Sequence, residues 1–322
     1  MQKLFKAAAV AVISGILLAG CSPVQDSKSV VLVTHDSFVI SDDLIHKFES
    51  DSGYKLKVVK AGDAGAMTNK LILTKDQPIG DAVFGIDNTL IGLAQENGIL
   101  AGDLQPIDFG DVCMNYDIDW FANKGIPAPT DISQLTNPAY KNLTVVENPA
   151  SSSTGMAFLA TTVAKFGDPG YLNYWKRLKA NGVKVDAGWE DAYFTDFSGS
   201  SGHGAYPIVL SYSSSPAYEV RDNGKSQTAS ILKDCYRQTE YAGVLARGKN
   251  NRGARALVNF MLSQNFQKAL PEMMYVYPMT RDIELPGDWE KFAPPASTLV
   301  GEQLDVVAGR KGWISQWSSL FE

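Results

Sequence analysis

The chain of 322 residues contains only three histidines and three cysteines, so it offers little material for metal binding or nucleophilic catalysis. His35, His46 and His203 lack the short spacings that zinc sites use. The sequence also has no Gly-x-Ser-x-Gly motif, no P-loop and no His-Glu-x-x-His motif. These absences weigh against common hydrolases, nucleotide-binding enzymes and metalloproteases. We therefore expect no metal, no cofactor and no catalytic residue.

Positively charged residues are also in the minority. The sequence has 29 lysines and arginines and 35 acidic residues, so its formal net charge is −6 at pH 7. An acidic surface argues against nucleic acid as a partner and suits a cationic ligand. Internal repeats and low-complexity blocks are absent from the sequence.

The N-terminus has the features of an export signal. Lys3 and Lys6 precede an apolar run over residues 7–18. The run is shorter than the about 20 residues of a membrane-spanning helix, and it has the proportions of the apolar region of a secretory signal. The signal therefore predicts an exported protein.

Small residues precede the first cysteine, in the order Leu-Ala-Gly-Cys, as at a bacterial lipoprotein processing site. We expect residues 1–20 to be removed, Cys21 to be acylated and residues 21–29 to form a polar tether. The lipid would anchor the protein to a membrane, facing the periplasm or the cell exterior. The alternative is an ordinary signal peptide with an incidental cysteine.

Two further cysteines, Cys113 and Cys235, remain in the mature chain. An even pair in an exported protein predicts a disulfide. The alternative is a pair of unrelated buried thiols.

Strand-like apolar runs alternate with helical patterns, which predicts an α/β protein with mainly parallel sheets. The opening residues 30–85 have a β-α-β-α-β pattern, and a second set of strands and helices covers residues 142–212. Ser41 is expected to cap the first helix and Gly53 to end it. The C-terminal third is predicted to be helical.

Three polar or glycine-rich loops follow the first three predicted strands, over residues 35–38, 62–65 and 85–88. Ligands of doubly wound sheets bind in such loops, at the carboxyl ends of the strands. These loops are therefore candidate ligand contacts.

Three later segments also favour binding. Residues 151–155 (Ser-Ser-Ser-Thr-Gly) begin a predicted helix, where hydroxyls and free N–H groups can hold an anion. Residues 188–193 place a tryptophan after a glycine, and residues 211–218 place two tyrosines around a hydroxyl cluster. Aromatic faces of this kind attract a cation and stack on a flat heterocycle.

These segments resemble the thiamine-binding periplasmic protein family, which serves ABC-type importers. Residues 34–38 (Thr-His-Asp-Ser-Phe) are similar to the family's Thr-Tyr-Asp-Ser-Phe, and residues 85–88 to its Gly-Leu-Asp-Asn. Gly-Trp with Ala-Tyr in residues 188–193, and Ser-Tyr with Ser-Pro-Ala-Tyr in residues 211–218, are similar to two later motifs. The likeness is collinear over the mature chain.

The resemblance implies a two-lobed periplasmic-binding-protein fold, with each lobe a mostly parallel sheet flanked by helices and joined by hinge crossovers. It implies that residues 30–112 and 238–322 form lobe 1 and residues 113–237 form lobe 2. Cys113 and Cys235 would then lie at the hinge strands. The implied ligand-binding residues are His35, Asp36, Asp63, Ala64, Gly65, Asp87, Ser152, Ser153, Trp189, Tyr212, Ser213, Ser214, Ser215, Tyr218 and Tyr275.

The resemblance further implies a monomer that carries thiamine or a thiamine phosphate to an importer permease. Two departures concern the pocket: His35 replaces a family tyrosine, and Tyr275 replaces a tryptophan. One alternative is a carrier for another solute, such as iron, a polyamine or a phosphonate. Another is a thiamine-degrading enzyme of the same fold, for which Cys113 would be the candidate nucleophile.

Overall fold

The computed structural model describes residues 28–287, 289–301 and 303–322. The expected signal segment, Cys21 and most of the expected tether lie outside the described residues. Within these ranges, none of the helices has the length and apolar character that crossing a membrane requires.

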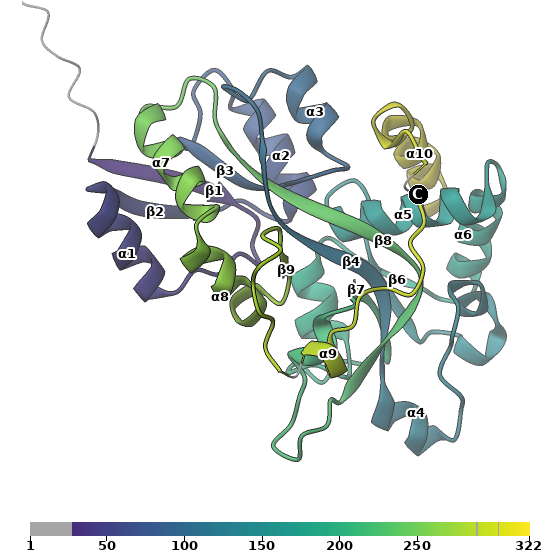
Figure 1. Cartoon of the computed structure of the whole chain (residues 1–322). Helices are drawn as coiled ribbons and strands as arrows, with labels where there is room; N and C mark the ends of the chain where they lie inside the picture. The colour runs from purple at the N-terminus through teal and green to yellow at the C-terminus, as the bar shows by residue number, and fades with distance from the viewer. Residues whose placement is uncertain (1–27, 288, 302) are drawn as a thin grey trace, which may run out of the picture.

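One mixed sheet runs through the whole molecule, in the order β2-β1-β3-β8-β4-β7-β5-β6, with β9 beside β4 (Figure 1). The two ends of the sheet are parallel, and β8 and β4 pair antiparallel in its middle. The strands are β1 (Ser29–Thr34), β2 (Lys55–Lys60), β3 (Ala82–Asp87), β4 (Gln105–Asp117), β5 (Thr144–Glu147), β6 (Lys184–Asp186), β7 (Ile208–Tyr212), β8 (Thr228–Val244) and β9 (Tyr277–Pro278).

The first lobe is built on β1, β2 and β3. Its hydrophobic cores lie on the two faces of this part of the sheet, one under helices α1, α7 and α8 and the other under α2 and α3. Phe48 of α1 packs against Phe260 of α7 with ring centroids 5.5 Å apart. The helices are α1 (Asp42–Ser52), α2 (Ala64–Leu73), α3 (Ile91–Glu96), α7 (Asn251–Met261) and α8 (Gln264–Met274).

The second lobe is built on β5, β6 and β7 and has the larger aromatic core. Trp175 is fully buried there and meets Trp317 edge to face at 5.6 Å. The helical segments are α4 (Ile118–Lys124), η1 (Ile132–Thr136), η2 (Pro138–Tyr140), α5 (Ser153–Phe166), α6 (Gly170–Ala180), η3 (Asp191–Asp196), η4 (Ser215–Ala217), α9 (Trp289–Phe292) and α10 (Val306–Phe321).

The C-terminal helix differs from the expected lobe boundaries. Trp317 lies on α10, which was expected in lobe 1 with residues 238–322, but its side chain is buried in the core of the second lobe. The reason is the apolar stripe of α10, which covers α6. The remaining boundaries stay a prediction.

Helix ends follow the capping signals of the sequence. The Ser41 hydroxyl accepts a hydrogen bond from the Leu44 amide at the start of α1. Gly53 ends this helix with a positive φ of 74°, a conformation that glycine adopts without strain. Both predicted caps are confirmed.

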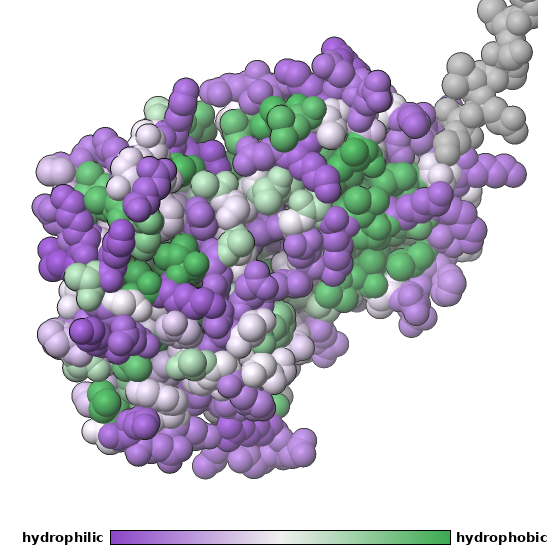
Figure 2. All heavy atoms as spheres, turned by 180° about the vertical axis from the view of Figure 1, so that it is seen from behind, coloured by the Kyte–Doolittle hydropathy of each residue, from purple (hydrophilic) through white to green (hydrophobic). Residues whose placement is uncertain are grey.

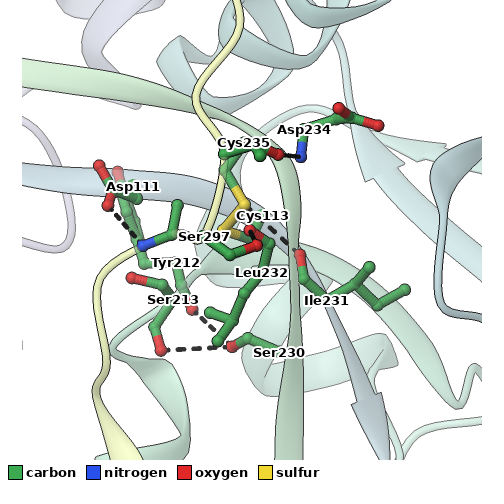
Figure 3. Close-up of a disulfide and its surroundings, with 12 residues drawn as sticks. Asp111, Cys113, Tyr212, Ser213, Ser230, Ile231, Leu232, Asp234, Cys235 and Ser297 are labelled. Atoms are coloured by element: carbon green, nitrogen blue, oxygen red, sulfur yellow. Dashed lines mark hydrogen bonds between the residues drawn. A yellow bond between two sulfur atoms is a disulfide. The ribbon is translucent and has the colours of Figure 1, made fainter. Parts of the chain in front are cut away.

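Strands β4 and β8 connect the lobes, and a disulfide joins them (Figure 3). Cys113 of β4 and Cys235 of β8 are bonded, with their Cα atoms 4.8 Å apart, which confirms the predicted pair. Beside it, Arg237 makes a bidentate pair with the buried carboxylate of Asp111. A third segment of the chain passes the hinge here, and its Leu299 forms a β-bridge with Cys235.

The outer surface is mostly polar. Seen from behind, hydrophilic side chains cover most of the face, and apolar side chains gather mainly on the half that carries the first lobe (Figure 2). The edge strand β2 contributes lysines that alternate with partly exposed apolar residues. Such charges discourage the pairing of an exposed edge with another chain.

We expect the double substitution of Cys113 and Cys235 by serine to lower the free energy of unfolding by about 2–4 kcal/mol. The physical reason is that the bond closes a loop between residues 122 positions apart and so restricts the unfolded chain. Urea denaturation of the oxidised protein and the variant measures this difference. A reductant should destabilise the wild type and leave the variant unchanged; equal midpoints for both oxidised proteins would contradict the expectation.

Candidate functional site

Two neighbouring cavities open between the lobes, and Ser37, Trp189 and Glu190 line both. The first, which we call the aromatic cavity, has a volume of about 170 Å³. Its lining residues are His35, Ser37, Val39, Trp189, Glu190, Tyr193, Phe194, Tyr212, Ser215, Tyr218, Glu240, Met273, Met274, Tyr275 and Val276. The second, which we call the polar cavity, is lined by Asp36, Ser37, Gly62, Asp63, Ala66, Ser151, Ala187, Gly188, Trp189, Glu190 and Asp191.

Several of these side chains follow the carboxyl ends of strands. His35 comes directly after β1, and Tyr212 ends β7. Tyr275 is the C-cap of α8 and has a left-handed backbone with φ of 55°. Segments from both lobes therefore meet at one cleft. Among them is the loop over residues 35–38, which the sequence predicts as a candidate ligand contact.

Aromatic rings form a continuous wall in the aromatic cavity. Trp189 stacks on Tyr193 with centroids 4.9 Å apart and an interplanar angle of 17°. Its indole N–H donates to the Ser211 hydroxyl at 2.9 Å, which fixes the ring. On the other side, Tyr218 and Tyr275 meet edge to face at 4.8 Å. Together these rings present flat π-faces of the kind that attract cations.

One carboxylate lies within this aromatic wall. Glu240 of β8 is only 6% exposed, and its Oε1 lies 3.3 Å from Nε2 of His35. The other ring nitrogen, Nδ1, hydrogen-bonds with the Ser37 hydroxyl at 2.9 Å. Burial lowers the pKa of His35, but Glu240, Asp63 and Asp36 together raise it by more, so the net pKa is above the ordinary value.

A glycine makes room for this histidine. Gly85 has a φ of +98°, and a Cβ atom there would lie 2.2 Å from Cδ2 of His35. Any other residue would strain the backbone and displace the ring. This accounts for the glycine that begins the 85–88 loop.

Three acidic residues lie side by side on neighbouring strands. Glu240 is the register partner of Asp87 on β3 and of Asp108 on β4. Burial and then the Glu240 carboxylate raise the pKa of Asp108 well above its ordinary value. Like charges directly opposite in a sheet are destabilising, and burial adds to this effect, so Asp87 and Asp108 hold their protons more tightly than isolated acids would.

A carboxylate occupies the helix start that the sequence predicts as an anion site. Asp63 accepts hydrogen bonds from the amides of Ala64 at 2.6 Å, Ser153 at 3.1 Å and Trp189 at 2.9 Å. Ser152 caps α5 through a 3.4 Å bond from the Gly155 amide. The Ser151 and Ser152 hydroxyls are therefore both used within the protein, since the Ser151 hydroxyl donates to the Ala187 carbonyl.

The structure separates the predicted site residues into four groups. His35, Trp189, Tyr212, Ser215, Tyr218 and Tyr275 line the aromatic cavity, and Asp36 and Asp63 line the polar cavity. Ala64, Gly65, Ser152 and Ser153 are buried behind the polar cavity, where α2 meets α5.

Asp87, Ser213 and Ser214 belong to neither lining within the described residues. The Asp87 Oδ1 accepts from the amide and hydroxyl of Thr89. The Ser214 hydroxyl donates to the Tyr275 carbonyl and so supports that ring's position. The hydrogen bonds of Asp87 and Ser214 support structural roles, and a ligand contact of these three residues stays a prediction.

Sequence reasoning missed Glu240, which supplies the buried charge of the aromatic cavity. It also missed Met273, Met274 and Val276, which complete one wall. The sequence offered only a single glutamate between Thr239 and Tyr241 as a signal for this role. A glutamate is ordinarily exposed, so this signal did not indicate a buried carboxylate.

The sequence matches the family described as bacterial extracellular solute-binding protein over residues 92–297. The chain belongs to this family. It is similar to the thiamine-binding periplasmic protein of Escherichia coli, with 29% identity over 94% of this chain and 96% of that protein.

Solved structures of solute-binding proteins share the fold. A periplasmic thiamin binding protein has a TM-score of 0.81 and 26% identity, covering 91% of this chain and 96% of its own. Iron-bound HitA from Pseudomonas aeruginosa has a TM-score of 0.71 and 16% identity, covering 91% of this chain and 99% of its own. This solute-binding chain therefore has the two-lobed periplasmic-binding-protein fold that its sequence resemblance implies.

We expect Asp87→Asn to flatten the pH dependence of stability. Burial raises the pKa of Asp87 to about 7, whereas an unfolded aspartate titrates near 4. The folded state then binds more protons, so this group's contribution to stability is present at low pH and is lost as the pH rises from about 4 to 7.

Urea titrations at pH 5 and pH 8 measure this effect. The variant should lose less stability over that interval than the wild type, by on the order of 2 kcal/mol. The exposed Asp103→Asn is the matched control and should follow the wild type. Parallel losses for Asp87→Asn and the wild type would contradict the expectation.

Proposed function

We propose that this chain captures thiamine or a thiamine phosphate outside the cytoplasm and delivers it to an ABC importer. The observation that carries the proposal is the combination of a buried carboxylate, Glu240, with the rings of Trp189, Tyr212, Tyr218 and Tyr275 in one cavity. Thiamine has a flat aminopyrimidine ring and a flat, cationic thiazolium ring joined by a methylene group, so it matches both features. The similar proteins named for thiamine binding support the same solute.

Each feature of the cavity has a distinct role in this proposal. The aromatic faces hold the pyrimidine and thiazolium rings, and each cation–aromatic contact contributes about 0.5–2 kcal/mol. Glu240 supplies the opposite charge in a site shielded from water, where the attraction is stronger than in bulk solvent. His35, paired with Glu240, sets the polarity of the same wall.

The polar cavity would receive the hydroxyethyl or phosphate end of the ligand. It adjoins the aromatic cavity through Ser37, Trp189 and Glu190. The Ser151 hydroxyl lies on its second-lobe side, where it donates to the Ala187 carbonyl and can accept a hydrogen bond from the ligand. Asp36 and Asp63 on the first-lobe side disfavour a highly charged phosphate, which favours thiamine over its diphosphate.

The proposal includes the cellular setting that the N-terminus indicates. Cys21, after removal of residues 1–20, would carry a lipid that holds the protein at a membrane surface on the periplasmic or outer side. The protein would act as a monomer, and its closed form would dock on the importer permease. It would have no catalytic activity.

Other carriers of this fold bind different solutes. Tyr212 and Tyr218 both reach the aromatic cavity, but they are not adjacent, and adjacent tyrosines would favour iron. No group of three or more histidine, cysteine or acidic residues is placed to hold a metal in the part of the chain that the structure describes. The acidic row around Glu240 makes a polyamine the second candidate.

A thiamine-degrading enzyme would need a free nucleophile in the cleft. The described residues include two cysteines, Cys113 and Cys235, and they are bonded to one another at the hinge. This arrangement supports a carrier. Incubation with thiamine followed by chromatography should show no released thiazole.

We expect thiamine to bind and Glu240→Gln to weaken its binding at least tenfold, about 1.4 kcal/mol. The change removes the charge and keeps the shape. Glu190→Gln is the matched control, because Glu190 lines both cavities but is exposed and therefore screened by solvent.

Isothermal titration calorimetry with thiamine, its two phosphates, spermidine and ferric citrate measures these affinities. Thiochrome, an uncharged oxidation product of thiamine, should bind both proteins equally. No heat with thiamine or either phosphate would overturn the proposed ligand. Equal thiamine affinity of Glu240→Gln and the wild type would overturn the role of the carboxylate.

We expect Cys21→Ser to release the protein from membranes. The acyl chains, each held by about 0.8 kcal/mol per buried CH₂, would be lost with the sulfur. Metabolic labelling with palmitate and membrane fractionation measure the change. Unlabelled wild-type protein in the soluble fraction would contradict the lipid anchor.

A further inference from the structure

Asp63 belongs to the first lobe, but most of its hydrogen bonds reach the second. It caps α2 by accepting from the Ala64 amide. Its Oδ1 also accepts from the Ser153 amide at 3.1 Å, and its Oδ2 accepts from the Trp189 amide at 2.9 Å. Both donors are backbone groups of the second lobe.

Two helices therefore begin at one carboxylate. Helix α2 of the first lobe and α5 of the second both direct N-terminal amides at Asp63. Each helix end carries a partial positive charge, and the two ends would repel one another without an anion between them. The carboxylate of Asp63 turns this repulsion into attraction.

The backbone around this contact is close-packed. The Ala66 amide of α2 donates to the Ser151 carbonyl at 2.9 Å across the lobes. A Cβ atom on Gly65 would lie 2.7 Å from that same carbonyl, and one on Gly188 would lie 3.2 Å from the Asp63 side chain. Glycines at both positions permit the approach.

Asp63 is placed behind the aromatic rings and not among them. It lines the polar cavity but not the aromatic cavity of the described chain, and its oxygens are directed at amides. One of those amides is that of Trp189, whose ring lines both cavities. The carboxylate therefore connects lobe closure to the position of an aromatic ring.

We propose that Asp63 is an interlobe latch, which holds the closed state by bridging the N-terminus of α2 to the Ser153 and Trp189 amides. It is a positioning residue that acts through closure, because its oxygens accept from backbone amides of the second lobe. The inference rests on the solute-binding function and not on which solute is bound. A latch of this kind controls how fast the solute leaves, because the lobes must part before release.

Asp63→Ser tests the latch, since serine can still cap α2 but is too short to reach the second lobe. Asp305→Ser is the matched control. Asp305 also caps a helix, since it accepts from the Ala308 amide at the start of α10, but it lies in neither cavity lining of the described residues. Asp63→Asn keeps the size of the side chain and should show an intermediate effect.

Stopped-flow tryptophan fluorescence with thiamine separates the two rate constants. We expect Asp63→Ser to dissociate at least tenfold faster than the wild type, with an association rate within about threefold. Asp305→Ser should retain the wild-type dissociation rate. Unchanged dissociation in Asp63→Ser, or equal acceleration in both variants, would overturn the latch.

Amide hydrogen exchange gives a test that needs no solute. The Ser153 and Trp189 amides should lose protection at least tenfold in Asp63→Ser and keep it in Asp305→Ser, while the core amides of α6 stay protected in all proteins. Equal protection in all three would overturn the latch. Failure of thiamine to bind would overturn only the proposed ligand, because the exchange experiment decides the latch separately.

Discussion

Strands β4 and β8 pair along most of their length in the middle of the sheet, and the site depends on this pairing. The register sets Asp108 opposite Glu240 and Asp117 opposite Thr228, so one ladder spans both lobes. The disulfide and the Asp111–Arg237 pair lie within the same ladder. The lobes are thus joined at a reinforced hinge, and the cleft opens beside it.

The same ladder gives the cleft its charge. Glu240 has acidic neighbours on both sides in the sheet, Asp87 and Asp108, and burial makes both neighbours costly to ionise. His35 partly offsets this cost from the first lobe. A cationic solute would offset it further, so the site is most favourable electrostatically when such a solute is bound. The aromatic rings then supply shape and the acidic row supplies preference for a cation.

Much of the architecture could be predicted from the sequence. The outer strands either alternate apolar and polar residues or are apolar throughout, and both patterns are typical of strands. The strands β1, β2 and β7 lie where their patterns indicate, and Ser41 and Gly53 bound α1 as expected. The two central strands were not recognised from their composition. Strand β8 contains Lys233, Asp234, Arg237 and Glu240, because its polar residues form the hinge and the site.

The site could be predicted in part for a similar reason. The aromatic residues Trp189, Tyr212, Tyr218 and Tyr275 come together because the motifs that carry them follow strands or end helices. The roles of the acidic residues could not be predicted in this way, because they depend on the strand register and on which amides donate to each carboxylate. Asp87 follows a strand as a ligand contact would, yet it bonds Thr89, whereas Glu240 sits inside a strand and faces the cavity.

A crystal structure of the protein grown with thiamine tests the central claim most directly. The account predicts the ligand in the aromatic cavity, with its thiazolium ring beside the Glu240 carboxylate and its ring faces against Tyr218 or Tyr275. Thiamine bound elsewhere, or bound with the thiazolium ring pointing away from Glu240 into solvent, would contradict the account.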